Sequence, residues 1–278
     1  EATERIMFLW RNDRTVVIGR NQSAYRECDV SRLEADGGHL ARRLSGGGAV
    51  FHDLGNLNYS FIADAKDAGQ LTMERFTLPV VDALCSLGLD AVASGRNDIS
   101  IEGRKVSGTA QRLAEGRVLH HGTLLFDSDP SMLAGALRVD PQKFRAKRAK
   151  SVRSRVGNIH DFLLREGKDM TLSEFWNHLK KALAGDGLVP DKLDTWELER
   201  VRHLKEERYD SWEWVYGRSP AYDLCNRRWW DGGELEVRAS IKRGRVSDIR
   251  FFGDFLAVLP LTALTEELIG CPYRREAF

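Results

Sequence analysis

The sequence predicts an α+β fold in which helices cover the faces of a mixed or antiparallel sheet, followed by a small α+β domain at the C-terminal end. Three observations support this class. Short strand-like segments are joined by tight turns, as in antiparallel strands. Other segments carry apolar residues at helical spacing. With 278 residues, 42% of them hydrophobic, the chain can bury one sizeable core, and its length favours one large domain with a smaller one.

Composition excludes several classes of protein. A charged fraction of 30% with a net charge of +1 is typical of an ordinary soluble protein. No apolar run approaches the roughly 20 residues that cross a bilayer, and the first residues lack a signal-peptide pattern, so we expect a cytoplasmic protein without membrane contact. The four cysteines lie far apart without metal-ligand spacing, so we expect reduced thiols, mostly in packed positions. They are Cys28, Cys85, Cys225 and Cys271.

The first predicted elements are short. Residues 5–10 and 15–18 have strand character on either side of a polar turn, so we expect a strand pair that Gly19 closes. A short helix is expected over residues 31–35, ending at the glycines that follow.

The most distinctive segment is residues 42–61, RRLSGGGAVFHDLGNLNYSF. The three consecutive glycines at 46–48 allow backbone N–H groups to converge on an anion, because no Cβ stands in the way. A flexible loop would also explain a glycine run. The flanks favour the first interpretation: residues 49–51 have strand character, 53–55 resemble a turn, and 56–62 alternate back toward apolar. We therefore expect the glycines at the mouth of a hairpin.

Residues 98–108 predict a second hairpin, with Glu102 and Gly103 as its two-residue turn. The expected register pairs Arg104 with Ile101, Lys105 with Ser100, Val106 with Ile99, and Ser107 with Asp98. Because side chains alternate between the faces of a strand, Ile99, Ile101 and Val106 would build core. The opposite face would carry Asp98, Ser100, Lys105 and Ser107, and it is available for chemistry.

Further elements complete the large domain. A longer helix is expected over residues 72–87, with a buried face that covers a sheet. Residues 118–126 predict another strand, in which His120 and His121 lie on opposite faces, so only one of them can point at a site. A capping box at residues 171–174 opens a further helix that runs to about residue 184.

The aromatic segment at residues 212–220 indicates a domain junction. It divides the chain into a catalytic domain, residues 1–212, and an accessory domain, residues 213–278. The accessory domain is expected to hold two strands, which turn at residues 243–244, and a short helix over residues 260–269.

Four features could meet in one pocket: the glycine-rich hairpin, Arg43, the polar hairpin face with Asp98 and Lys105, and one of the two histidines. Together they suit a reaction on a phosphorylated nucleotide, in which backbone amides hold phosphate oxygens and Arg43 adds a bidentate contact. Lys105 would place positive charge where negative charge develops, and Asp98 could hold Mg²⁺ or orient that lysine. Each residue alone also has an ordinary explanation, as a solvated surface charge, a turn cap or a structural histidine.

Taken together, the motifs resemble a known family. In chain order they are WRNDRTVVIGRNQ (10–22), the segment 42–61, SGRND (94–98), GRKVSGTA (103–110), HHGTLL (120–125), SVRSRVGN (151–158), SWEWVYG (211–217), GELEV (233–237) and GCPYR (270–274). This series is similar to the successive motifs of bacterial lipoate-protein ligases and covers nearly the whole chain. The resemblance implies a catalytic domain of the biotin and lipoate ligase type.

The resemblance also implies a two-step reaction. The carboxylate of lipoate attacks the α-phosphate of ATP, and a lysine amine of an acceptor domain then attacks the lipoyl-adenylate. The acceptors would be E2 subunits of 2-oxoacid dehydrogenases and the glycine cleavage H protein. Lys105 matches the family's catalytic lysine, and Asp98 would hold Mg²⁺. The positions expected to contact ATP are Arg43, Gly48, Ala49, Val50, Phe51, Asn97, Asp98 and Lys105. Those expected to contact lipoate are Trp10, Val17, Arg43, Ser45, Gly48, His52, Lys105 and His121.

Other functions stay open on the sequence alone. A transferase could move a preformed lipoyl or octanoyl group without ATP, although no cysteine lies in the motifs that are expected to form the pocket and could carry a thioester. A biotin-ligase-like enzyme would share the fold, and a silent ligand-binding module is a third alternative, against which intact Arg43 and Lys105 argue. The basic segment at residues 143–155 is expected to close over the adenylate or to dock an acidic acceptor, rather than to bind nucleic acid. Relatives carry a helix before the first strand and another near the C-terminal end, so the lipoate pocket and the accessory domain are expected to be less extensive here.

Overall fold

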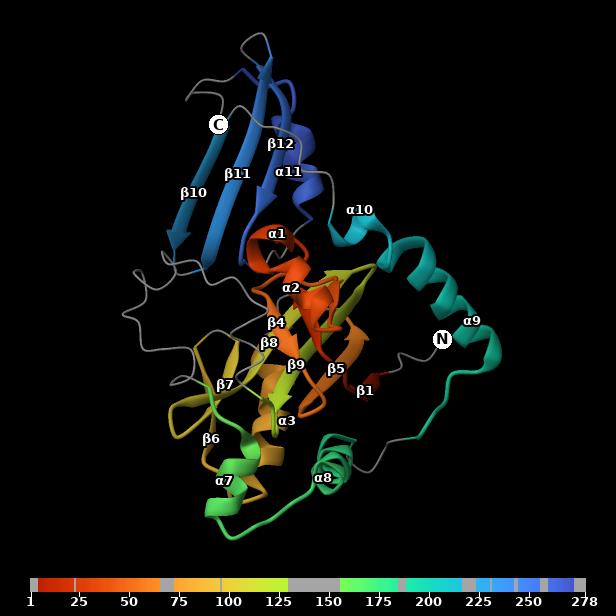
Figure 1. The fold of residues 1–278 in the computed structure, drawn as a ribbon, viewed down its shortest axis with the longest axis vertical. Helices are drawn as coiled ribbons and strands as arrows, with labels where there is room; N and C mark the ends of the chain where they lie inside the picture. The colour runs from red at the N-terminus through yellow and green to blue at the C-terminus, as the bar shows by residue number, and fades with distance from the viewer. Residues whose placement is uncertain are drawn as a thin grey trace.

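The computed structural model describes residues 5–272 except residues 23, 66–72, 96, 130–155, 185–188, 217–223, 231, 243–244 and 256–259. The described residues form three β-sheets with helices around them (Figure 1), which confirms the predicted α+β class. The basic segment 143–155 and the expected turn at 243–244 lie outside the described residues. Within the described part of the chain, no helix is long and apolar enough to cross a membrane.

The largest sheet has six antiparallel strands in the order β1-β5-β9-β8-β7-β6. They are β1 (Ile6–Trp10), β5 (Asn56–Asp64), β9 (Arg117–Leu125), β8 (Arg104–Ala114), β7 (Asp98–Ile101) and β6 (Ala91–Ser94). One face packs on the helices α3 (Met73–Cys85), α7 (Ile159–Arg165) and α8 (Leu172–Ala184). Tyr59, Ile99 and Leu124 of the sheet are fully buried in this core. The helices therefore cover one face of the sheet, and the opposite face is left for a site.

Two helices follow their sequence signals closely. α3 buries Val80, Val81 and Leu84, the face that helical spacing predicts. α8 opens at the predicted capping box: Thr171 Oγ1 accepts from the Glu174 N–H at 3.2 Å, and the Glu174 carboxylate accepts from the Thr171 N–H at 2.8 Å. The short helix α7 between them was not predicted.

A second sheet has three strands. β2 (Thr15–Ile18) lies between β3 (His39–Arg42), which is parallel to it, and β4 (Val50–His52), which is antiparallel. α1 (Ala24–Glu27) and the predicted helix α2 (Val30–Ala35) pack against this sheet through Ala24 and Leu33.

Two predicted strand pairs are wrong, because their members belong to different sheets. β1 pairs with β5 and not with β2, and β4 pairs with β2 and not with β5. The reason lies in burial: residues 56–60 of β5 are all buried, so β5 lies inside a sheet with β1 and β9 on its two sides. The chain turns after β4, where the Asp53 carbonyl accepts from the Asn56 N–H at 3.1 Å, and passes into the large sheet. The glycine run therefore precedes a crossing between sheets instead of a hairpin.

The hairpin of β7 and β8 turns at Glu102 and Gly103, whose φ angles of 50° and 75° fit the predicted two-residue turn. Arg104 and Lys105 pair with Ile101 and Ser100 as predicted. Beyond them the predicted register is wrong, because a bulge at Val106 shifts the pairing by one residue. Ser107 pairs with Ile99 and is fully buried, and Gly108 takes the place beside Asp98 that was expected for Ser107.

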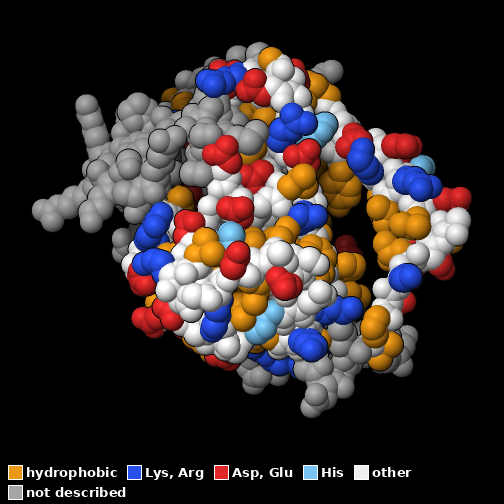
Figure 2. Space-filling model, turned by 60° about the horizontal axis from the view of Figure 1, so that its bottom comes forward, with side chains coloured by type: hydrophobic (Ala, Val, Ile, Leu, Met, Phe, Trp, Pro, Cys, Tyr) orange, Lys and Arg blue, Asp and Glu red, His pale blue; other side chains and the backbone are white. Residues whose placement is uncertain are grey.

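A helical arm follows α8 in the chain. It consists of α9 (Thr195–Leu204), the π-helical turn η3 (Lys205–Tyr209) and α10 (Trp212–Val215). Figure 1 shows α9 beside the body of the molecule, and α9 has no buried residue. Figure 2 shows hydrophobic side chains on this arm, at the right of the view, along the side that faces a gap before the body. Trp196, Leu198, Val201 and Leu204 of α9 are exposed.

In the described residues of the region expected to be the accessory domain, the structure has three antiparallel strands and a helix, where two strands and a helix were predicted. The strands are β10 (Leu224–Trp230), β11 (Gly233–Lys242) and β12 (Arg245–Phe252), and the helix is α11 (Leu261–Leu268). The segment LCNRRWW of β10 was missed because its polar and apolar residues do not alternate.

Candidate active site

A cavity of about 810 Å³ lies over the free face of the large sheet. The second sheet and the glycine loop form its side, and residues of the accessory domain reach its wall. Of the positions predicted to contact substrates, most line this cavity: Trp10, Val17, Arg43, Gly48, Ala49, Val50, His52, Asn97, Asp98, Lys105 and His121. Two do not line it. Phe51 packs in the core of the second sheet, and Ser45 is buried behind the wall.

Strand pairing sets the floor of the cavity. One row of facing residues runs across five strands, and we call it the floor row: Trp10, Asn58, Thr123, Gly108 and Asp98. The Gly108 N–H donates to Thr123 Oγ1 at 3.2 Å, which joins the β8 and β9 members of the row. The floor row is charged at its Asp98 end and uncharged at its Trp10 end.

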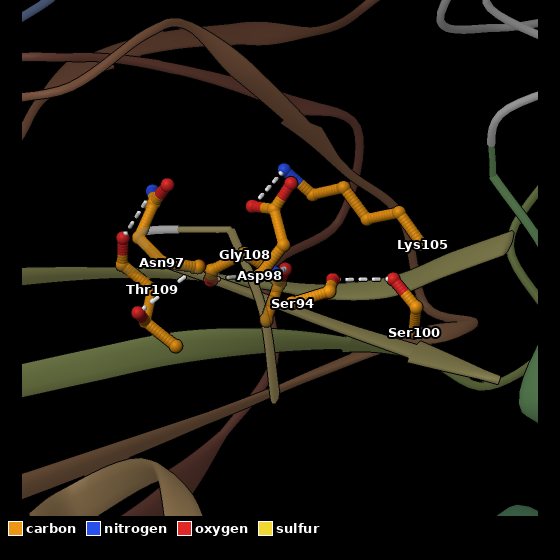
Figure 3. A network of polar contacts seen from close by, with 8 residues as sticks. Ser94, Asn97, Asp98, Ser100, Lys105, Gly108 and Thr109 are labelled. Carbon is orange, nitrogen blue, oxygen red and sulfur yellow. Dashed lines mark hydrogen bonds and ion pairs between the residues drawn. The ribbon is translucent and has the colours of Figure 1, made fainter. Parts of the chain in front are cut away.

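Asp98 and Lys105 form an ion pair at the charged end, with 2.7 Å between Lys105 Nζ and Asp98 Oδ1 (Figure 3). Gly108 makes room for it, because a Cβ at that position would lie 3.0 Å from Lys105 Nζ. The neighbouring Asn97 is fixed by its side-chain amide, which donates to the Thr109 carbonyl at 2.9 Å. The bulge in β8 therefore brings a glycine under the lysine and holds the ammonium group at the cavity wall.

The glycine loop is wrapped around Arg43. The guanidinium donates to the carbonyls of Val17 at 3.1 Å, Gly46 at 2.6 Å and Gly48 at 2.8 Å, and to Ser45 Oγ at 3.2 Å. Burial lowers the pKa of Arg43 to about 10, with the Asp254 carboxylate acting in the opposite direction, so the side chain stays charged at neutral pH. Since the Gly48 carbonyl is turned toward Arg43, the N–H of the same peptide, on Ala49, points the other way. Arg43 thus orders the loop that was predicted to present N–H groups.

The accessory domain contacts this loop directly. The Gly47 N–H donates to the Phe255 carbonyl at 3.1 Å, and the Gly253 N–H donates to the Asn21 carbonyl at 2.9 Å. A Cβ on Gly48 would lie 3.0 Å from Asp254 Oδ2. A carboxylate of the accessory domain therefore rests against the loop that sequence reasoning assigned to anion binding.

The two adjacent histidines take opposite roles, as their alternation predicted. His120 is fully buried on the core side, where its ring stacks on Phe76 with 5.1 Å between centroids. His121 lines the cavity, and its Nε2 lies 2.6 Å from Ser45 Oγ. Burial, helped by the charge of Arg43, lowers the pKa of His121 to about 3 and that of His52 to about 4. Both cavity histidines are therefore neutral at physiological pH.

Sequence reasoning missed several residues of the cavity wall. Trp229, Trp230 and Asp254 come from the accessory domain, and no motif indicates that this domain lies near the glycine loop. Asn58 of the floor row had one signal, because asparagine is uncommon inside a strand.

A resident metal is not supported by the described side chains, among which no group of three or more His, Cys, Asp or Glu could hold an ion. Mg²⁺ usually needs fewer than three protein ligands, because it binds one or two carboxylates together with the phosphates of a nucleotide. Asp98 is a carboxylate at the cavity wall and fits this second kind of site.

Two family models that match this chain place its fold and cavity in a class of enzyme that joins an acyl group to a protein. The lipoyl protein ligase A/B catalytic domain model matches residues 1–184, and the bacterial lipoate protein ligase C-terminus model matches residues 219–278. The chain therefore belongs to the lipoate-protein ligase family. It is 40% identical over 281 residues to the lipoate-protein ligase LplJ of Bacillus subtilis, with 99% of this chain and 83% of the relative covered.

Solved structures agree with this assignment. LipL1 of P. falciparum in complex with lipoate matches with a TM-score of 0.80 and 25% identity, over 100% of this chain and 81% of that one. The bipartite ligase of Thermoplasma acidophilum, determined with its E2 lipoyl domain, matches with a TM-score of 0.67 and 36% identity, and the match covers 80% of this chain and 87% of that one. A lipoate-protein ligase A bound with ATP matches with a TM-score of 0.65 and 31% identity, and the match covers 77% of this chain and 86% of that one.

Proposed function

We propose that this chain is an ATP-dependent lipoate-protein ligase, in which residues 1–212 carry the chemistry and residues 213–278 form the accessory domain. The observation that carries the proposal is the ion pair of Lys105 and Asp98, which holds an ammonium group on the same cavity as the glycine loop. Family membership supplies the reaction class, and the relatives determined with lipoate and with ATP support the two substrates.

In the first step a lipoate carboxylate oxygen bonds to the α-phosphorus of ATP, and the bond from that phosphorus to the leaving pyrophosphate breaks. Both reactants are anions, so the step needs fixed positive charge and oriented N–H dipoles more than a protein nucleophile. Lys105 is assigned this role, because a compact ammonium can bridge oxygens of the carboxylate and the phosphate. Asp98 orients Lys105 and would bind Mg²⁺ that arrives with ATP.

The glycine loop is assigned to the nucleotide. N–H groups of Gly48, Ala49 and Val50 would face the phosphates, with Arg43 holding the loop from behind and Asn97 beside Asp98. For Gly47 and Gly48 to be reached by a phosphate, the segment that carries Asp254 must give way, because its carboxylate and carbonyl occupy that side of the loop.

Lipoate is assigned to the rest of the cavity. Its carboxylate would lie near Lys105, and its apolar tail would run along the floor toward Trp10, with Val17, His52 and His121 around it and Ser45 in contact with His121 behind the wall. The neutral histidines suit this role, because an uncharged imidazole can contact an apolar tail without a large desolvation cost.

In the second step the uncharged ε-amine of an acceptor lysine attacks the lipoyl carbonyl carbon, AMP leaves, and the amine nitrogen loses a proton to solvent. The acceptors we propose are the E2 lipoyl domains of 2-oxoacid dehydrogenases and the glycine cleavage H protein. The archaeal relative determined with its E2 lipoyl domain supports the first of them. These partners and the ATP supply agree with the cytoplasmic location expected from the sequence.

The competing route, transfer of a preformed acyl group through a thioester, finds no support in the site. None of Cys28, Cys85, Cys225 and Cys271 lines the cavity, and Cys28 is buried in the core of the second sheet. The deciding experiment is pyrophosphate release from ATP with lipoate and without an acceptor. A ligase releases pyrophosphate under these conditions. Folded protein that releases none would overturn the ligase assignment and leave the transferase.

A further inference from the structure

At the uncharged end of the cavity, two polar side chains each have one atom without a hydrogen-bond partner among the described residues. His52 and Asn58 both line the cavity, with exposed fractions of 3% and 1%. Among the described residues, neither His52 Nε2 nor Asn58 Nδ2 has a hydrogen-bond partner. Buried polar atoms are nearly always paired in folded proteins, so two such atoms on one cavity wall point to a ligand group that pairs with them.

Both atoms are hydrogen-bond donors. The Asn12 side-chain amide lies 3.1 Å from His52 Nδ1 and donates to it, so the neutral ring carries its hydrogen on Nε2. Asn58 Oδ1 already accepts from Asn56 Nδ2 at 3.0 Å, which leaves the Asn58 NH₂ group free. The ligand group that fits this end must therefore accept hydrogen bonds, and it must tolerate the aromatic ring of Trp10, whose centroid lies 6.0 Å from that of His52.

The position of these donors matches the tail of the acid and not its carboxylate. Asn58 is two strands away from Gly108 along the floor row, and Lys105 Nζ lies against Gly108. Two strand spacings correspond to about 10 Å, close to the reach of an extended lipoate tail. With the carboxylate at Lys105, the dithiolane ring reaches Asn58, His52 and Trp10.

We propose that Asn58, together with His52 and the ring of Trp10, recognises the two sulfur atoms of the dithiolane ring and so selects lipoate over a fatty acid of the same chain length. This inference rests on the proposed function. Divalent sulfur is a weak hydrogen-bond acceptor that also packs favourably against aromatic rings, so it satisfies both features of this end. A methyl or methylene group in the same place would leave the two donors unpaired.

The first test leaves the protein unchanged. Pyrophosphate release is measured with lipoate and with cyclopentylpentanoic acid, in which two methylene groups replace the sulfurs and the shape is kept. Because two weak hydrogen bonds are lost, kcat/KM should be about fivefold lower for the carbocyclic acid. Equal values for the two acids would overturn the inference. No release with either acid would instead overturn the proposed function, so the two failures are distinguishable.

The second test replaces the donor. In Asn58→Leu the preference for lipoate over the carbocyclic acid should fall from about fivefold to about twofold, because one of the two donors that separate the acids is gone and His52 keeps the other. Asn226→Leu, the same change at an exposed position on β10, should keep the preference. An Asn58→Leu protein that still prefers lipoate as strongly as the unaltered one would contradict the role of Asn58. If that variant does not fold, the comparison of lipoate with the carbocyclic acid on the unaltered protein tests the inference by itself.

Discussion

Replacing Lys105 with methionine should separate the chemistry of the site from the stability of the fold. The change removes the ammonium group that lies 2.7 Å from Asp98 and keeps the length of the side chain. The two side chains are 39% and 33% exposed, so their pair stabilises the fold by only about 0–1 kcal/mol. A fixed charge placed where negative charge develops contributes far more to the rate, and its loss should slow adenylate formation about 100-fold to 1,000-fold.

The assay is single-turnover pyrophosphate release at saturating ATP and lipoate, with urea unfolding as the measure of stability. Because Lys105→Met also leaves Asp98 unpaired near the phosphates, the double variant Asp98→Asn with Lys105→Met shows how much of the loss is repulsion. Arg165→Met is the control. Arg165 of α7 forms an ion pair with Glu102, at the turn of the same hairpin, at 2.9 Å, and neither residue lines the cavity. A Lys105→Met rate within about threefold of the unaltered rate would refute the role given to this lysine.

Three further predictions concern the walls of the cavity. Asp254→Asn should bind ATP several-fold more tightly in calorimetry, because its carboxylate rests on the glycine loop beside Arg43 and repels phosphate; weaker binding would count against that explanation. Gly48→Val should weaken ATP binding more than lipoate binding, since a Cβ there obstructs the approach of phosphate; the opposite ranking would argue against the loop as the nucleotide site. His121→Gln should lose less stability than the unaltered protein when the pH falls from 7 to 5. The folded-state pKa of His121, about 3, is below the ordinary 6.5, so its contribution is complete above pH 6.5 and declines as the pH falls toward 3. By pH 5 that loss amounts to about 2 kcal/mol, and equal losses in urea unfolding would contradict the assignment.

Local signals predicted many elements of this fold correctly. The capping box of α8, the two-residue turn at Glu102 and Gly103, and the opposite faces of His120 and His121 all depend on residues close together in the chain. Such features depend on dihedral preferences and on the two-residue period of a strand. Both can be recognised in a short segment of sequence.

Strand pairing was predicted less well, because it is decided by distant residues. Three residues separate β4 from β5, which favours a hairpin locally, yet β5 is buried along its length between β1 and β9. The bulge at Val106 has a similar origin. The bulge keeps Val106 in the core and places Gly108 under Lys105. No local signal within residues 98–108 predicts that a bulge forms there.

In the candidate site, too, residues within local motifs were predicted and contacts between distant parts of the chain were not. Motif residues of the large domain, such as Lys105, Asp98 and His121, were located from the sequence and line one cavity. Asp254 was not located, because its contact with Gly48 joins positions more than two hundred residues apart and depends on how the accessory domain sits on the loop. The absence of partners for His52 Nε2 and Asn58 Nδ2 is likewise visible only in three dimensions.

The central claim, that this cavity activates lipoate with ATP, is tested most directly by mass spectrometry of the protein after incubation with lipoate, ATP and Mg²⁺ without an acceptor. We expect bound lipoyl-adenylate, which disappears when an E2 lipoyl domain is added and appears as a lipoyl group on that domain. The Lys105→Met protein should carry none above background. Folded, unaltered protein that holds no adenylate, yet modifies the acceptor when given a preformed lipoyl thioester, would contradict the account.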